Sequence, residues 1–164
     1  MIRVKDAEAS LKFYKEVMGM QLKRTHEMKA GGFNLYFLGY GSAPDITAEG
    51  VSPTANSEGL LELTWNYGTE KDADFSYHNG NAEPQGFGHI CITVDDLDAA
   101  CARFEEKNVN WKKRLTDGRM KNIAFVLGTC PRLHLAEWPS ANKSRRPRRL
   151  LDRGCPEREV EDEE

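Results

Sequence analysis

Two side chains of this sequence combine a residue type and a position suited to metal chemistry. Glu62 lies inside an apolar run, LLELTW, where burying an ionised carboxylate is costly unless a partner or a metal neutralises it. His89 opens a β-branched segment whose alternate residues share one face, so Cys91 and Thr93 lie on the face of His89. A glutamate and a histidine form half of a ligand set for Zn²⁺, Ni²⁺ or a similar divalent ion. Each residue also has a plainer interpretation, Glu62 as a solvent-facing carboxylate and His89 as a core histidine.

An internal repeat indicates which elements position these side chains. Residues 2–6 and 92–96 are similar at an offset of 90, which also pairs Tyr14 with Phe104 and Arg24 with Arg114. Each copy opens with a short strand, followed by an acidic residue, Asp6 or Asp96, that can cap a helix with apolar residues at helical spacing. Further strands are predicted over 33–40, 60–65 and 123–127. The repeat therefore predicts an α+β fold with two modules of the type βαββ or βαβββ, and we expect paired βαβββ modules.

The composition divides the chain into a folded part and a charged end. We expect one domain over 1–138, with modules at about 1–67 and 86–138, and an atypical last strand. Two loops, 39–58 and 68–88, are rich in Gly, Pro, Asp and Asn and should run over the surface or cover a site. Residues 139–164 combine an arginine cluster with an acidic end and few apolar residues, which is typical of a disordered tail.

Charge and cysteine content exclude several classes of protein. The 164 residues carry a net charge of -3, which argues against nucleic-acid binding by the main body. No apolar run approaches the roughly 18 residues that a membrane span needs, and the amino terminus does not read as a signal peptide. The four cysteines form no CxxC pair, which argues against a disulfide framework. These observations predict a cytoplasmic protein that binds neither membrane nor nucleic acid.

The repeat also predicts where further ligands should lie. The equivalent of His89 in the first copy would precede Met1. The equivalent of Glu62 is expected after the strand that ends at Leu127, where Glu137 is the only carboxylate.

Several long strings carry a resemblance to a known family. MIRVKD, FNLYFLGY, LELTWNYGTEKD, YHNGNAEPQGFGHICITVDD and DGRMKNIAFVL resemble lactoylglutathione lyase, the glyoxalase I enzyme of the vicinal-oxygen-chelate superfamily, and most of all its fungal members. The similarity spans about residues 1–127 and ends near Gly128. It implies a homodimer, or one double-module half of a longer fused chain. It also implies metal-dependent isomerisation of the methylglyoxal–glutathione hemithioacetal to S-lactoylglutathione, a detoxification reaction.

The resemblance further implies roles for individual residues. Glu62 and His89 match metal ligands, for Zn²⁺, Ni²⁺ or another divalent metal, and Glu62 is also implied to be available as a proton acceptor. The fourth ligand, a glutamate, is implied about eight residues after Leu127, where this sequence has Leu135. Glu137 is the second catalytic candidate and could take this place if the strand moved by two residues, which keeps the same face. Glutathione, the co-substrate, is implied to be held by basic, amide and backbone groups at Arg3, Asn66, Lys113, Arg119 and Met120. The methyl group of the substrate is implied to contact an apolar pocket formed by Phe33, Leu35 and Phe37.

Two alternatives to this activity stay open at the level of sequence. One is a catalytically inactive relic that keeps a glutathione-binding groove, since two of the four implied ligands are not found. The other is a different vicinal-oxygen-chelate activity, such as a ring-cleaving dioxygenase or a thiol transferase, which favours two histidines and one carboxylate around iron or manganese. Bound divalent metal discriminates an enzyme from a relic.

Overall fold

The chain forms two four-stranded sheets, each with one helical segment. A computed structural model describes residues 1–41, 54, 57–128 and, for the backbone, 132–137. The first module contains β1 (Ile2–Val4), α1 (Ala7–Lys12), the π-helical turn η1 (Phe13–Val17), β2 (Gln21–Met28), the turn η2 (Lys29–Gly31), β3 (Phe33–Gly39) and β4 (Leu61–Asn66). After the turn η3 (Thr69–Lys71), the second module contains β5 (His89–Val94), α2 (Leu97–Glu106), β6 (Trp111–Lys113), β7 (Ile123–Val126) and β8 (Arg132–Glu137). The charged tail predicted for 139–164 lies outside the described residues.

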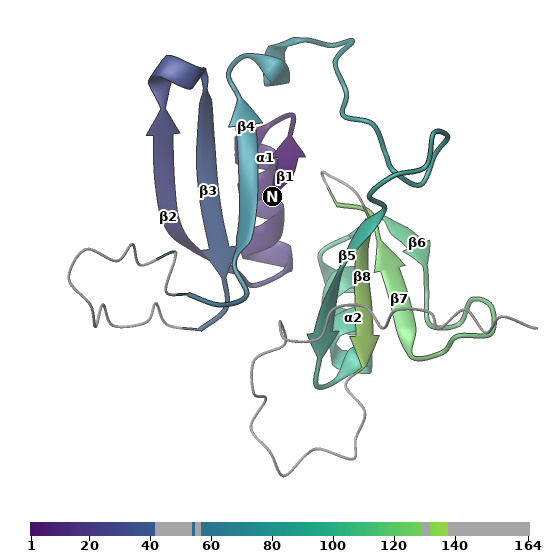
Figure 1. The fold of residues 1–164 in the computed structure, drawn as a ribbon. Helices are drawn as coiled ribbons and strands as arrows, with labels where there is room; N and C mark the ends of the chain where they lie inside the picture. Colours follow the sequence, from purple (N-terminus) through teal and green to yellow (C-terminus); the bar gives the residue numbers. More distant parts are fainter. Residues whose placement is uncertain (42–53, 55–56, 129–131, 138–164) are drawn as a thin grey trace, which may run out of the picture.

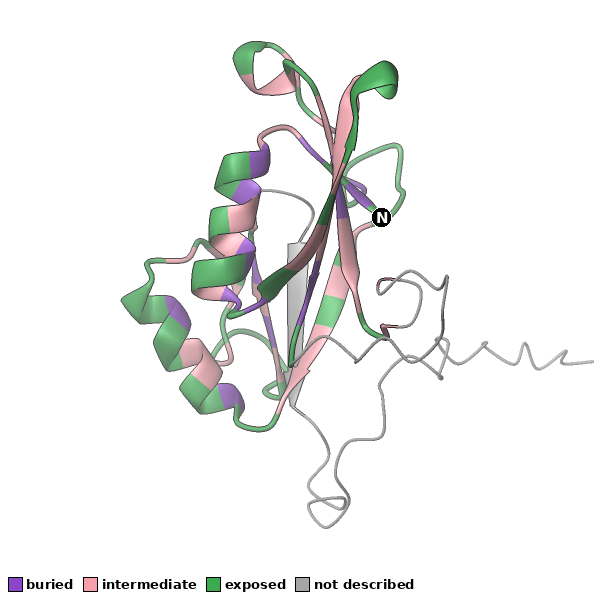
Figure 2. Ribbon diagram, turned by 90° about the vertical axis from the view of Figure 1, so that its left-hand side faces the viewer, coloured by how far each residue is buried: buried purple, intermediate pink, exposed green. Residues whose placement is uncertain are grey.

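The two sheets have the same topology. Their strand orders are β1-β4-β3-β2 and β5-β8-β7-β6, and the first strand of each module pairs in parallel with its last. The sheets lie beside each other (Figure 1), and both helices cover the same side of them (Figure 2). The α+β fold of paired βαβββ modules predicted from the repeat is confirmed.

Both helices begin at the aspartates expected from the sequence. Asp6 Oδ1 accepts a hydrogen bond from the backbone N–H of Ala9 (3.1 Å), and Asp96 Oδ1 accepts one from Ala99 (2.8 Å). Each cap satisfies a backbone donor that the first helical turn leaves without a partner. The two modules therefore start their helices in the same way.

One hydrophobic core joins the two modules on the helical side of the sheets. Val4, Leu38, Leu63 and Val126 are fully buried in it, and Tyr14 is 1% exposed. A longer-range polar contact supports this packing: Arg103, in α2, donates to the carbonyl oxygens of residues 17 (2.9 Å) and 16 (2.8 Å) at the end of η1. The modules are thus held together through their helices.

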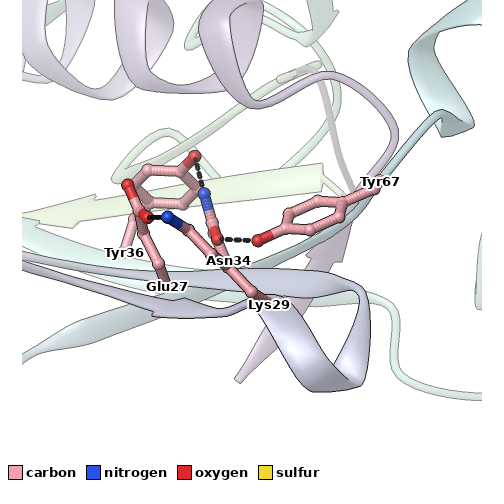
Figure 3. Close-up of polar contacts among 5 residues, drawn as sticks. All are labelled: Glu27, Lys29, Asn34, Tyr36 and Tyr67. Atoms are coloured by element: carbon pink, nitrogen blue, oxygen red, sulfur yellow. Dashed lines mark hydrogen bonds and ion pairs between the residues drawn. The ribbon is translucent and has the colours of Figure 1, made fainter.

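On the helical side, the hairpin end of the first sheet carries a polar network. Asn34 Nδ2 donates to the Tyr36 hydroxyl (3.3 Å), and the Tyr67 hydroxyl donates to Asn34 Oδ1 (2.7 Å) (Figure 3). Lys29 forms an exposed ion pair with Glu27 (3.3 Å) beside them. A cavity of about 670 Å³ lies on the same side, between α1 and the sheet. None of the candidate site residues lines this cavity.

Candidate functional site

The face of the first sheet that turns away from the helices gathers most of the predicted site. Along β4, Leu63 points into the core and is fully buried, so the alternate residues Glu62, Thr64 and Asn66 lie on the opposite face. In β3 their register partners are Phe37, Leu35 and Phe33 respectively, all half-buried. The three apolar residues predicted as a pocket therefore lie beside the predicted carboxylate.

Arg3 joins this face from the neighbouring strand. It is in register with Thr64, while Ile2 and Val4 on either side of it are buried in the core. Its Nη1 donates to Asn66 Oδ1 (3.2 Å), and Asn66 Nδ2 donates to the hydroxyl of Tyr77 (3.0 Å). The Arg3–Asn66 pair is thus a preformed cationic and amide group that can bind a carboxylate.

Three residues of this face were not identified from the sequence. His26 packs edge-on against Phe37, with ring centroids 5.6 Å apart, and Tyr77 extends the Arg3–Asn66 chain of hydrogen bonds. Thr64 is 3% exposed, and its Oγ1 has no hydrogen-bond partner within the described part of the chain. A buried polar atom without a partner costs about 1–3 kcal/mol, and this cost falls at the centre of the face, where Thr64 is in register with Arg3 and Leu35. In the sequence, the only indication for His26 is its position between Thr25 and Glu27 in the polar segment QLKRTHEM.

The second sheet has a corresponding face that contains His89. Ile90, Ile92 and Val94 pack against the core, and the intervening residues His89 and Cys91 are exposed on the other face. The His89 ring contacts Phe125 edge-on, with centroids 5.8 Å apart. Partial desolvation raises the pKa of the Cys91 thiol. His89 and Glu62 therefore lie on equivalent faces but in different sheets.

The register of β8 differs from the one expected from the sequence. In the first sheet Ile2 is in register with Leu63, and in the second sheet its equivalent, Ile92, is in register with Leu135. Leu135 is therefore the equivalent of Leu63. The residue before it, His134, is the equivalent of Glu62. In the observed register, Leu133 and Leu135 pair with Ile90 and Ile92, so the leucines of β8 hold the same register positions as the core-packed residues of β5. The expectation that Leu135 stands at the ligand position is corrected accordingly.

Glu137 is not brought to the face of His89. It is in register with Val94, which packs against the core, and a shift by two residues would leave it on that same face. The structure therefore separates the two carboxylates that the sequence analysis proposed as catalytic, Glu62 and Glu137.

The basic residues near the second sheet differ in their surroundings. Lys113 Nζ donates to the carbonyl oxygens of Met120 (2.6 Å), Ile123 (2.9 Å) and Arg114 (3.2 Å), and so closes the loop between β6 and β7. Arg119 and Met120 are exposed in this loop. Lys113 thus orders the loop that presents the other two candidates for glutathione binding.

The described residues of the two faces include two of the candidate metal ligands, Glu62 and His89. Within the described part of the chain, no group of three or more His, Cys, Asp and Glu side chains is placed to hold a metal ion. Glu62 and His89 supply two of the implied ligands, one from each sheet.

The fold and this face define a class of protein: a paired βαβββ domain with a carboxylate, an arginine–amide pair and apolar side chains on the open face of one sheet. Residues 1–132 match the family model of the Glyoxalase/Bleomycin resistance protein/Dioxygenase superfamily. The chain belongs to this superfamily, which confirms the resemblance noted in its sequence.

Curated relatives and solved structures agree with this assignment. Lactoylglutathione lyase of Pseudomonas putida is 48% identical over 129 residues, which cover 77% of this chain and 75% of that protein. Glyoxalase I of Saccharomyces cerevisiae is 49% identical over 129 residues, 77% of this chain and 38% of the yeast protein. The solved structure of the trypanothione-dependent glyoxalase I of Leishmania major has a TM-score of 0.62 at 30% identity and covers 84% of this chain and 82% of its own. The chain thus spans most of one relative and well under half of another.

Proposed function

We propose that this chain catalyses the isomerisation of the hemithioacetal of methylglyoxal and glutathione to S-lactoylglutathione, as a lactoylglutathione lyase of the glyoxalase I type. The observation that supports this most directly is the first-sheet face, where the Arg3–Asn66 pair lies on the same side as Glu62 and the apolar residues of β3. This arrangement suits a substrate with a carboxylate at one end and a small apolar group at the other.

The proposed reaction requires one proton to move between adjacent carbons. Glu62 removes the proton from the carbon that carries sulfur and hydroxyl, which leaves an enediolate, and returns that proton to the neighbouring carbon that carried the ketone. The hydroxyl proton passes in the same reaction from the oxygen of the sulfur-bearing carbon to the former ketone oxygen. The sulfur-bearing carbon becomes the thioester carbonyl and the neighbour becomes the alcohol carbon, so no oxidant or reductant is consumed. A positioned carboxylate that transfers a proton in this way typically contributes a factor of about 10² to 10⁴ in rate.

The other residues of the face would bind and orient the substrate. The guanidinium of Arg3, oriented by Asn66, would bind the γ-glutamyl carboxylate. Phe33, Leu35 and Phe37 would contact the methyl group and exclude water from the reacting carbons. Arg119 and the backbone of Met120, on the loop closed by Lys113, would bind the glycyl end of glutathione.

Metal, assembly and location form the finer part of the proposal. A divalent ion, Zn²⁺ or Ni²⁺, would polarise the substrate oxygens when bound, with Glu62 and His89 as two of its ligands. The functional unit would be a homodimer or a longer chain that contains this segment, in keeping with the 38% of the yeast relative that it spans. No helix in the described part of the chain is long and apolar enough to cross a membrane, and a cytoplasmic location is proposed from the charge and cysteine content.

The test compares Glu62→Gln with Glu106→Gln, an exposed carboxylate in α2 that serves as the matched control. Thioester formation is followed by ultraviolet absorbance after metal content has been measured by mass spectrometry. Glu62→Gln is expected to lower kcat by about 10² or more, with binding of S-methylglutathione retained, and Glu106→Gln to leave both unchanged. Equal activity of the two variants would contradict the role of Glu62. Binding of S-methylglutathione without turnover by the parent chain at full metal occupancy would instead support the inactive relic.

A further inference from the structure

The cavity between α1 and the first sheet has no part in the proposed isomerisation. Its volume of about 670 Å³ lies within the range of about 300–1,000 Å³ typical of small-molecule sites. One wall is α1, and the other contains two aromatic side chains of the sheet, Tyr36 of β3 and Trp65 of β4. Glu70, in the turn η3, lines the cavity as well. The cavity thus combines aromatic rings with a carboxylate.

The carboxylate of Glu70 is held against the indole of Trp65. Glu70 Oε2 accepts a hydrogen bond from Trp65 Nε1 (3.0 Å), and both residues are half-buried. The turn that carries Glu70 is itself anchored, because the Thr69 hydroxyl donates to the carbonyl oxygen of Lys5 (2.6 Å). Within the described part of the chain, Glu70 Oε1 has no hydrogen-bond partner. One oxygen therefore orients the carboxylate, and the other can accept a hydrogen bond from a ligand.

Hydrogen bonds and a ring contact also fix the two aromatic side chains. The Tyr36 hydroxyl accepts a hydrogen bond from Asn34 Nδ2 (3.3 Å), and Asn34 Oδ1 accepts one from the Tyr67 hydroxyl (2.7 Å) (Figure 3). The Tyr67 ring packs against Trp65, with ring centroids 5.2 Å apart. A ligand would therefore meet rings that are already ordered, which lowers the entropic cost of binding.

The second module shows how an indole and a carboxylate bind a cation in this protein. The guanidinium of Arg114 lies 4.8 Å from the centroid of the Trp111 ring and forms an ion pair with Glu105. Aromatic faces attract cations, and indole does so most strongly. Trp65 and Glu70 offer the same two groups, and no cation from the described residues stacks on the Trp65 ring. An external cation can therefore bind there as Arg114 binds within the second module.

The lining of the cavity is more acidic than basic. Its charged residues are four carboxylates and two lysines: Asp6, Glu8, Glu16, Glu70, Lys12 and Lys15. Both lysines are exposed on the helical wall, where their long side chains can extend into solvent. Ala7 and Leu11 add apolar surface to the same wall. A ligand with one positive charge and an apolar body suits this lining.

We infer that the cavity between α1 and the first sheet binds a small organic cation, a primary ammonium group on an apolar body, through the rings of Trp65 and Tyr36 and the carboxylate of Glu70. Trp65 and Asn66 are successive residues of β4, so this site lies on the opposite side of the sheet from the Arg3–Asn66 pair. The inference does not depend on the proposed isomerase reaction.

Benzylamine and benzyl alcohol test the inference without a variant, because they have the same apolar body and differ in charge at neutral pH. Each is titrated into the isotope-labelled full chain, and the indole N–H resonance of Trp65, assigned with Trp65→Phe, is followed by NMR. We expect a saturable shift with benzylamine, at an affinity about tenfold or more above that for benzyl alcohol. The indole resonance of Trp111, in the second module, should not move.

Variants locate the charge that binds the ligand. Glu70→Gln keeps an acceptor for the Trp65 indole and removes the charge, so it should weaken benzylamine binding about tenfold or more. Glu106→Gln, an exposed carboxylate in α2, is the matched control and should change the affinity by less than about twofold. Circular dichroism verifies that each variant is folded.

Three outcomes would overturn the inference. The first is equal affinity for benzylamine and benzyl alcohol, and the second is benzylamine binding that Glu70→Gln leaves unchanged. The third is a benzylamine response confined to Trp111, which would place the cation in the second module. Loss of isomerase activity alone would bear on the proposed function and not on this site.

Discussion

Replacing Arg3 should selectively weaken recognition of the γ-glutamyl carboxylate. Arg3 is exposed on β1, between two buried residues, so its substitution should leave the fold intact. Its Nη1 donates to Asn66 Oδ1 at 3.2 Å, a contact that orients the planar guanidinium. A hydrogen bond to a charged group contributes about 1.5–3 kcal/mol. Arg3→Met should therefore lower the affinity for S-methylglutathione roughly 10- to 150-fold, since about 1.4 kcal/mol corresponds to a tenfold change.

Isothermal titration calorimetry with two ligands makes this prediction specific. S-methylglutathione carries the γ-glutamyl carboxylate, whereas S-methylcysteinylglycine lacks it and should bind equally well to the parent chain and to Arg3→Met. Arg3→Lys keeps the charge but loses the planar pair of donors, so its affinity should lie between the two. Arg114→Lys is the matched control, because Arg114 pairs with Glu105 and stacks on Trp111 away from this face. A change of less than twofold in Arg3→Met, or an equal loss for both ligands, would refute the assigned role.

Three further predictions concern stability. Leu63→Ala removes a fully buried side chain from the centre of the first sheet and should lower the free energy of unfolding by about 2–5 kcal/mol, measured by urea denaturation; a loss below 1 kcal/mol would contradict the core described here. Arg103→Ala should cost about 1–2 kcal/mol and increase hydrogen exchange at the end of η1, whereas unchanged exchange there would show that the contact does not hold the modules together. The N–H of Arg114 lowers the pKa of the Asp117 carboxyl below its ordinary 3.8, so the stabilisation of this loop is present above pH 3.8 and is lost as the pH falls through the lower, folded value. An NMR titration of Asp117 that gave a pKa of 3.8 or above would contradict this.

The elements with a strong local signal could be predicted from the sequence. Asp6 and Asp96 were identified as helix caps because each precedes apolar residues at helical spacing, and both caps are present. β3 and β4 were predicted within one residue at each end because they are apolar and bounded by glycine-rich loops. β2 was not placed, because its sequence QLKRTHEM is polar and its side chains are mostly exposed.

The site residues could be predicted only in part, because faces depend on register. The alternation in β3 and β4 was sufficient to place Phe37 beside Glu62. In β8, counting residues from Leu127 leads to Leu135, whereas the pairing with β5 makes His134 the equivalent of Glu62. An error of one residue in a strand assigns every residue to the opposite face of the sheet. The structural role of Lys113 depends on three backbone carbonyl oxygens, which no pattern of side-chain types reveals.

The contact made by Arg103 has a consequence for how the two modules can diverge in evolution. Its two acceptors are backbone carbonyl oxygens at positions 16 and 17, which every amino acid provides. Substitutions on the first module at these positions can therefore accumulate without removing an acceptor, whereas the second module must keep an arginine at its single position. The two hydrogen bonds therefore restrict the side chain on one side only, and at residue 16, which is exposed, the side chain of η1 can change while the relative placement of the modules is kept.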